Sequence, residues 1–213
     1  GANTTWSKLK ELVLSSNRIG DEGAVSIGSN TTWKILETLE LHQNEIGDAG
    51  ASIIGSNAVW VKLKELALGR NNISAKAAII IGSNEAWNNL ELLSLSENQI
   101  GDQGAVAIAN NATWHKLKKL SLNTNKIEDE GISSLSKNAV WTDLEELKIY
   151  NNPFKNTSLL HQVFSGEAWK NLKTFIPFVS RALKDFLDSI KKKKGVTEVS
   201  LCSRALKDED AII

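Results

Sequence analysis

The chain has 213 residues, a hydrophobic share of 41%, 25 Lys plus Arg against 25 Asp plus Glu, three His and one Cys. This length and apolar content exclude a disordered chain, and a formal net charge of zero provides no positive field that would attract nucleic acid. No apolar run approaches the roughly 18 residues that a membrane-spanning helix needs, and Cys202 with so few histidines provides neither a disulfide scaffold nor a zinc cluster.

Tryptophan recurs along the chain at a nearly constant interval. Five successive spacings are 27 residues and one is 28. The series is Trp6, Trp33, Trp60, Trp87, Trp114, Trp141 and Trp169. Each tryptophan opens a unit that reads W-x-x-L-x-x-L-x-L-x-x-N-x-I-G-D-x-G-A, and six near-complete copies cover residues 3 to about 165. The chain is therefore predicted to be a repeat protein.

Within one unit the elements follow in a fixed order. The L-x-x-L-x-L stretch alternates as a short strand. The chain then turns at Asn-x-Ile-Gly, where Gly20, Gly47 and Gly101 are expected to adopt positive φ. The aspartates after the turn are expected to act as helix N-caps or first-turn acids: Asp21, Asp48, Asp102 and Asp129. A short outer helix follows, over Gly23 to Ser29 in the first unit. One strand and one helix cannot bury their apolar faces alone, so the units are expected to stack.

This pattern resembles the leucine-rich repeat L-x-x-L-x-L-x-x-N-x-L. The tail I-G-D-E-G-A and the upstream N-T-T resemble its ribonuclease-inhibitor-like subclass, which is similar to the repeats of NOD-like receptors and of the Ran GTPase-activating protein. Two departures are the tryptophan in place of an aliphatic residue and a period one or two residues short. The resemblance implies an α/β leucine-rich repeat solenoid, or horseshoe, of seven to eight repeats, with parallel strands on the concave face and short helices on the convex face. It also implies a non-catalytic module that binds a protein through the concave face.

Three columns of residues are expected to hold the stack together. Leucine and isoleucine fill the interior, and the asparagines of the turns place their amides between adjacent units. The tryptophans are expected to be buried where each helix returns to the next strand.

The regular 27-residue repeats occupy residues 1–169, and residues 170–213 form degenerate repeats of the same solenoid. Pro177 leaves the strand register of the seventh unit open, and an eighth unit starts near Val196. Neither end shows a polar cap. We therefore expect a fragment of a longer array that associates end to end.

The outward strand positions form four columns on the concave face that hardly repeat, although the scaffold columns repeat almost letter for letter. The first column is Glu11, Thr38, Glu65, Leu92, Lys119 and Glu146; the second is Val13, Glu40, Ala67, Ser94, Ser121 and Lys148; the third is Ser15, His42, Gly69, Ser96, Asn123 and Tyr150; the fourth is Ser16, Gln43, Arg70, Glu97, Thr124 and Asn151. This contrast marks the face as available for recognition. The candidate partner-binding residues are Glu40, His42, Arg70, Tyr150, Lys148 and Leu92. Cross-strand ion pairs are expected between Arg70 and Glu97 and between Lys119 and Glu146.

Catalysis is not expected, because the three histidines lie in different columns and no serine or cysteine has a histidine at a matching position. No cofactor or metal is expected, and the partner is expected to be a protein rather than nucleic acid or membrane. The alternatives are a regulatory or sensor segment of a larger protein, of the NOD-like receptor or GTPase-activator type, and a bacterial effector that engages a host. The lone cysteine and the absence of a signal sequence favour a cytoplasmic location or an exported effector.

Overall fold

The structure is a computed structural model that describes residues 6–156, 159, 171–176 and 198–199. Its strands are β1 (Glu11–Val13), β2 (Thr38–Glu40), β3 (Glu65–Ala67), β4 (Leu92–Ser94), β5 (Lys119–Ser121), β6 (Glu146–Lys148), β7 (Thr174–Ile176) and β8 (Glu198–Val199). Its helices are α1 (Gly20–Gly28), α2 (Asp48–Gly55), α3 (Ala75–Gly82), α4 (Gly101–Ala109) and α5 (Asp129–Ser136). None of these helices is long and apolar enough to cross a membrane.

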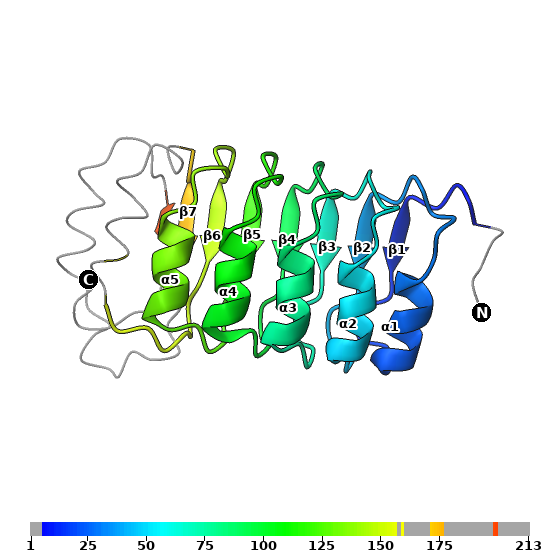
Figure 1. The fold of residues 1–213 in the computed structure, drawn as a ribbon, viewed down its shortest axis with the longest axis horizontal. Coiled ribbons are helices and arrows are strands. Elements are labelled where there is room, and N and C mark those ends of the chain that lie inside the picture. Colours follow the sequence, from blue (N-terminus) through cyan, green and yellow to red (C-terminus); the bar gives the residue numbers. More distant parts are fainter. Residues whose placement is uncertain (1–5, 157–158, 160–170, 177–197, 200–213) are drawn as a thin grey trace.

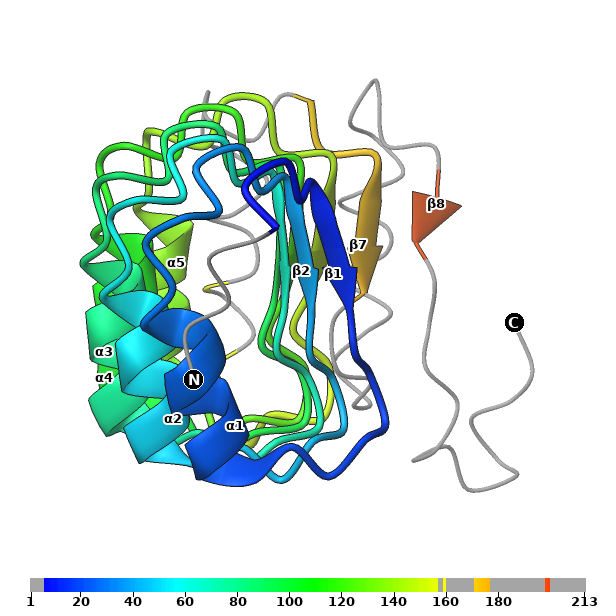
Figure 2. The ribbon, with the colours of Figure 1, turned by 90° about the vertical axis from the view of Figure 1, so that its right-hand side faces the viewer.

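All strands run parallel in one sheet in the order of the sequence, β1 to β8. From β1 to β6 each residue lies opposite the residue 27 positions later, such as Leu12 opposite Leu39. The helices form a second row beside the sheet, so the molecule has two layers (Figures 1 and 2). This arrangement is the predicted α/β solenoid, because stacking in repeat register is what lets each unit bury its apolar side.

The strand register continues into the degenerate C-terminal region. Phe175 of β7 lies opposite Leu147 of β6, and Val199 of β8 lies opposite Phe175. The shift from a 27-residue to a 28-residue spacing at Trp169 therefore leaves the register of the seventh strand intact. Most of the predicted C-terminal unit, including Pro177 and Cys202, lies outside the described residues.

The core lies between the two layers and consists of the repeated apolar columns. The leucines and isoleucines of the inner repeats, from Leu36 to Ile127, have 0% exposed surface at the positions that the motif repeats. The tryptophans of the second to sixth repeats are buried as predicted, from 4% exposed at Trp33 to 0% at Trp141, whereas Trp6 is 53% exposed. The tryptophans are thus part of the hydrophobic core wherever a preceding repeat covers them.

The side chains of five turn asparagines join neighbouring repeats as predicted: Asn44, Asn71, Asn98, Asn125 and Asn152. Asn71 Oδ1 accepts hydrogen bonds from the backbone N–H groups of Asn44 and Ile46, both at 3.0 Å. Its Nδ2 donates to the carbonyls of Leu41 and Leu68, also at 3.0 Å. One buried amide therefore satisfies backbone groups that the bend leaves without a partner in two repeats.

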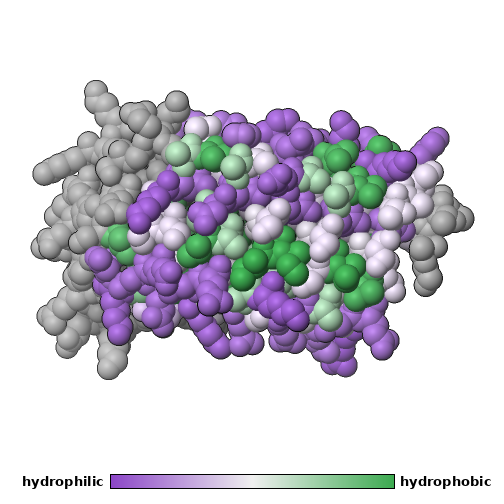
Figure 3. Space-filling model, viewed as in Figure 1, coloured by the Kyte–Doolittle hydropathy of each residue, from purple (hydrophilic) through white to green (hydrophobic). Residues whose placement is uncertain are grey.

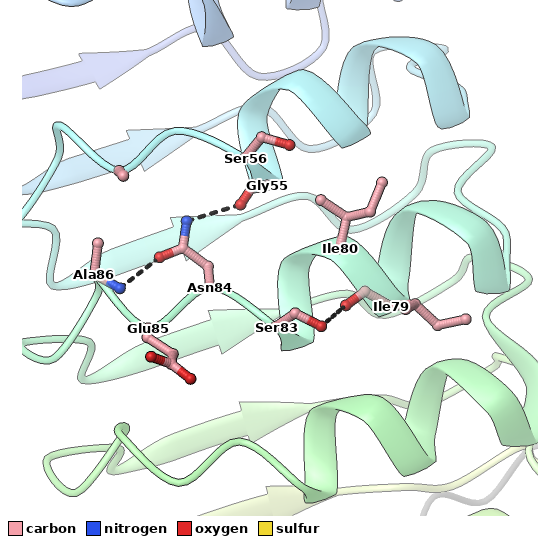
Figure 4. A pocket seen from close by; sticks show the side chains of 9 residues that line it. Gly55, Ser56, Ile79, Ile80, Ser83, Asn84, Glu85 and Ala86 are labelled. Carbon is pink, nitrogen blue, oxygen red and sulfur yellow. Dashed lines mark hydrogen bonds between the residues drawn. The ribbon is translucent and has the colours of Figure 1, made fainter.

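A second column of asparagines, the loop asparagines, precedes the tryptophans. We did not predict from the sequence that this column is part of the scaffold. It comprises Asn30, Asn57, Asn84, Asn111 and Asn138, all buried. Asn84 Nδ2 donates to the carbonyl of Gly55 at 2.8 Å, and Asn84 Oδ1 accepts from Ala86 N–H at 2.9 Å (Figure 4). The same pattern at Asn111 shows that its Asn-x-Thr sequence serves the scaffold.

The aspartates lie in the first turns of their helices, as predicted, but they bond to the next repeat rather than to their own helix. Asp102 Oδ1 accepts from the N–H groups of Glu128 and Gly131, at 2.7 and 3.0 Å. A carboxylate at this position satisfies donors at the N-terminal end of the following helix and is favoured by that helix dipole.

The turn glycines fulfil the prediction only in part. Gly20 and Gly101 have φ of +60° and +56°, but Gly47 is extended with φ of −96°. Within that turn Glu45 is left-handed, with φ of +59°. The N–H of Gly47 donates to Asp21 Oδ1 at 2.8 Å, as the N–H groups of Ser74 and Glu128 at the same position donate to Asp48 and Asp102. The expectation of positive φ at Gly47 was therefore wrong: its extended backbone is one that Ser74 and Glu128 also adopt at this position, so the backbone does not require a glycine there.

Candidate functional site

The four concave columns are aligned by the sheet register. Glu11, Thr38 and Glu65 lie opposite one another along the first column, and Val13, Glu40 and Ala67 lie opposite one another along the second. In the fourth column Ser16, Gln43, Arg70, Glu97, Thr124 and Asn151 all have left-handed backbone, with φ between 54° and 63°. The same bend therefore follows each of the strands β1 to β6, and it holds the outward side chains of these six repeats in line.

The predicted partner-binding residues lie on this face but form two groups. Glu40 and exposed His42 belong to the second repeat, next to exposed Arg70 of the third. Lys148 and half-buried Tyr150 belong to the sixth repeat. Three parallel strand spacings of about 4.8 Å separate the repeats of Arg70 and Tyr150, or about 14 Å. Half-buried Leu92 lies between the groups, on β4.

One of the two predicted cross-strand ion pairs is present. Arg70 Nε lies 2.9 Å from Glu97 Oε2, and both side chains remain about half exposed, at 57% and 44%. The prediction of a Lys119–Glu146 ion pair was wrong. Glu146 pairs instead with Lys148, which projects from the same side of the same strand. Within the described residues Lys119 has no ion pair and is exposed.

Small residues occupy the centre of the concave face between the two groups. A Cβ at Gly69 would lie 2.7 Å from Ser96 Oγ, so the glycine allows this serine side chain to approach the neighbouring strand. Ser94 Oγ lies 3.4 Å from Ser96 Oγ. With Ala67, these residues leave a low surface over which a partner could approach the backbone.

A ladder of alternating charge runs along the residues directly before the strands, and sequence reasoning missed it. It comprises Lys10, Glu37, Lys64, Glu91, Lys118, Glu145 and Lys173. Glu37 Oε2 accepts from Lys64 Nζ at 2.5 Å and Glu37 Oε1 lies 3.6 Å from Lys10 Nζ. Lys118 Nζ lies 2.7 Å from Glu91, and Lys173 Nζ 3.0 Å from Glu145. The sequence does indicate the ladder, because the sign of the charge at this position of the unit alternates from one repeat to the next.

The charge ladder shifts the protonation of its members. The hydrogen bond from Lys64, reinforced by its charge, lowers the pKa of Glu37 below the ordinary 4.5. The hydrogen bond to Glu37 raises the pKa of Lys64 above 10.5, and the bond to Glu91 does the same for the pKa of Lys118. These charges stabilise each other, so the ladder belongs to the scaffold rather than to the free surface of the concave face.

The helix face has apolar patches of its own. Figure 3 shows apolar residues gathered over the helices, where Ile53 of α2 and Ile79 of α3 are 38% and 40% exposed. A shallow hollow of about 450 Å³ lies between the C-terminal ends of α2 and α3, lined by Ile79, Ile80 and Asn84 among others (Figure 4). No group of three or more His, Cys, Asp or Glu within the described ranges is placed to hold a metal ion.

Comparison with known proteins identifies the repeat. A family model described as Leucine Rich repeat matches residues 7–28, 35–55, 88–109 and 115–136, and each match covers the strand, turn and helix of one unit. The chain is a leucine-rich repeat protein. None of the curated proteins compared with it matches significantly.

Among solved structures, the yeast Rad7 and Elc1 complex contains a chain that is 17% identical to this leucine-rich repeat protein, with a TM-score of 0.57 over 92% of the present chain. The present chain spans 47% of that chain. The tropomodulin C-terminal domain of Caenorhabditis elegans is 12% identical over 88% of this chain and 92% of its own, with a TM-score of 0.45. The plant peptide hormone receptor RGFR1, solved with RGF2, is 19% identical over 81% of this chain and 32% of its own, with a TM-score of 0.43. At these identities the Rad7 similarity shows a shared fold.

Proposed function

We propose that the chain is a non-catalytic protein-binding module that recognises its partner through the concave face. One observation carries the proposal: the four outward columns are held in register on an exposed face and yet differ at nearly every repeat, while the columns that build the scaffold are nearly invariant. The sheet register imposes the alignment, and the variation of the outward columns leaves this face free to carry the side chains that a partner requires.

The dimensions and charge of the face suit a protein epitope or an extended peptide. Six strands at about 4.8 Å span roughly 24 Å between the outermost strands. Glu11, Glu40 and Glu65 lie on three successive strands, and none of them has an ion pair within the described part of the chain. The first half of the face therefore favours basic groups of the partner, and Tyr150 provides an aromatic contact at the other end.

The test is capture of a partner by the wild-type chain and by two variants of equal net charge. The concave variant carries alanine at Glu40, His42, Arg70 and Tyr150. The convex control carries alanine at the exposed helix residues Glu22, Lys76 and Gln103. Circular dichroism and the thermal midpoint first establish that all three proteins fold equally.

The proposal expects a partner that the wild type and the convex control retain and the concave variant loses by at least tenfold. Equal retention by the concave variant, with loss in the convex control, would overturn the assignment and place recognition on the helices.

A further inference from the structure

The charged side chains of the concave face divide into paired and unpaired ones. Arg70 is paired with Glu97, and Glu146 is paired with Lys148. Four others, the unpaired charges, have neither an ion pair nor a side-chain hydrogen bond within the described part of the chain: Glu11, Glu40, Glu65 and Lys119. The unpaired charges are therefore acidic on β1, β2 and β3 and basic on β5.

Three of the unpaired charges stand in the first column at every second strand. Thr38 of β2 lies opposite both Glu11 of β1 and Glu65 of β3. Leu92 of β4 lies opposite both Glu65 and Lys119 of β5. At about 4.8 Å per strand, each interval between these charges is about 10 Å. The first column therefore presents an acid, a second acid and a base at equal spacing.

Residues that share a face of a polypeptide recur at distances that depend on its conformation. In a β-strand they are two residues, or about 7 Å, apart, and in an α-helix an interval of about 10 Å is reached only at every seventh residue. In polyproline II, which has three residues per turn and a rise of 3.1 Å, every third residue shares a face, and successive ones lie about 9.3 Å apart. The spacing in the first column therefore matches a polyproline II segment that is charged at every third position.

The surface beside the first column also suits an extended backbone. In the second column Ala67, Ser94 and Ser121 lie opposite one another on β3, β4 and β5, and Gly69 and Ser96 belong to the third column beside them. These small side chains let a bound backbone approach closely, and the serine hydroxyls can donate to its carbonyl groups. A polyproline II backbone has no internal hydrogen bonds, so its carbonyls are available, whereas an α-helix uses its own internally.

We propose that the concave face recognises a polyproline II segment that carries two basic residues three positions apart and an acidic residue three positions further, in either chain direction. This inference rests on the proposed function, because it names the partner of the same face. The basic groups would lie at Glu11 and Glu65, with Glu40 on the strand between them, and the acidic group at Lys119. Half-buried Leu92, between Glu65 and Lys119, would contact an apolar residue of the segment.

The experiment measures binding of labelled peptides to the full chain by fluorescence anisotropy at low ionic strength. The spaced peptides are R-P-P-R-P-P-D and its reverse, D-P-P-R-P-P-R. The control peptide R-R-P-P-P-D-P has the same composition and charge, but its three charges point to three different faces. We expect one spaced peptide to bind about fivefold more tightly than the control, and the difference to shrink at about 1 M NaCl, because the contacts are exposed ion pairs.

A charge swap locates the acidic group of the segment. The wild type is expected to prefer the spaced peptide over a version in which arginine replaces its aspartate, and Lys119→Glu is expected to reverse this preference. Lys116→Glu makes the same change of charge at an exposed residue outside the concave columns and should keep the wild-type preference. Circular dichroism establishes beforehand that both variants fold like the wild type.

Equal binding of the spaced and control peptides, or no binding of either, would overturn the match to polyproline II. An unchanged preference in Lys119→Glu would contradict the assignment of the acidic group to β5. The proposed function is judged by a separate result, because a partner that the wild type captures and the concave variant loses would support the concave face even when these peptides fail to bind.

Discussion

At the scale of single residues, the left-handed position that follows each of the strands β1 to β6 is occupied by residues that differ in how well they tolerate positive φ. Asn151 tolerates positive φ readily, whereas the β-branched Thr124 has φ of +58°. Thr124→Asn is expected to stabilise the protein by about 1 kcal/mol, because its side chain is exposed and only the backbone strain changes.

Urea denaturation measures the free energy of unfolding of this variant. The control is Thr142→Asn, at a threonine that is also exposed but is not among the residues with positive φ, and it should change the free energy of unfolding by less than about 0.5 kcal/mol. A loss of stability in Thr124→Asn would show that the backbone there is unstrained.

The aspartates of the helix starts give a second prediction at this scale. Asp102→Ala removes the acceptor of two N–H groups at the N-terminal end of α5, from Glu128 and Gly131. We expect a loss of about 1–2 kcal/mol, as for removal of a helix cap. Gln103→Ala, one residue along the same helix and exposed, is the control and should change the free energy of unfolding by less than about 0.5 kcal/mol. Equal effects of the two substitutions would show that the carboxylate does not cap the following helix.

At the scale of the elements, the turn asparagines join the turns of successive repeats through their side-chain amides. Asn71 and Asn72 are adjacent in the sequence, but Asn71 is 7% exposed with five hydrogen-bonded partners, and Asn72 is exposed. Asn71→Ala is expected to cost about 3 kcal/mol, because it leaves buried backbone groups of two repeats unsatisfied. Asn72→Ala should cost less than about 0.5 kcal/mol in the same denaturation experiment. Similar losses for both would contradict a structural role for the turn asparagines.

The charge ladder predicts a pH dependence. The folded pKa of Glu37 lies below its ordinary 4.5, so its contribution is present above that value and is lost as the pH falls through the lowered pKa. The folded pKa of Lys64 lies above 10.5, so its contribution is lost as the pH rises through the raised pKa. The thermal midpoint of Glu37→Gln should therefore lie below that of the wild type from about pH 5 to 10 and converge with it in acid. A difference that persists unchanged at about pH 2 would show that packing, and not charge, is lost.

At the scale of the whole molecule, a solenoid has no single centre, and the stability of each repeat depends on its neighbours. Leu93 in the fourth repeat is fully buried, and its counterpart Leu12 in the first is only partly buried. Leu93→Ala is expected to cost about 2–5 kcal/mol, and Leu12→Ala clearly less. Native-state hydrogen exchange should show the same order, with the amides of α1 exchanging faster than those of α3. Uniform protection along the array would mean that it unfolds as one cooperative unit.

The register of β1 to β6 could be predicted from the sequence, because tryptophan, leucine and asparagine recur with the period of the structure. The same columns determine which residues lie on the concave face. They do not determine local choices within a repeat: Gly47 is extended and donates its N–H to Asp21, and Glu146 turns to Lys148 rather than Lys119. The separation of Arg70 from Tyr150 follows from strand spacing alone, but which residue of the face binds depends on the shape of a partner.

The alternation of sign in the charge ladder has a consequence for how the array can change length. Loss of one internal unit, residues 57–83, would bring Glu37 beside Glu91, two carboxylates that repel. Loss of two units, residues 57–110, would bring Glu37 beside Lys118 and restore attraction. As far as these charges decide it, the array should therefore tolerate duplication or deletion more easily in pairs, that is in blocks of 54 residues, twice the 27-residue spacing of its tryptophans.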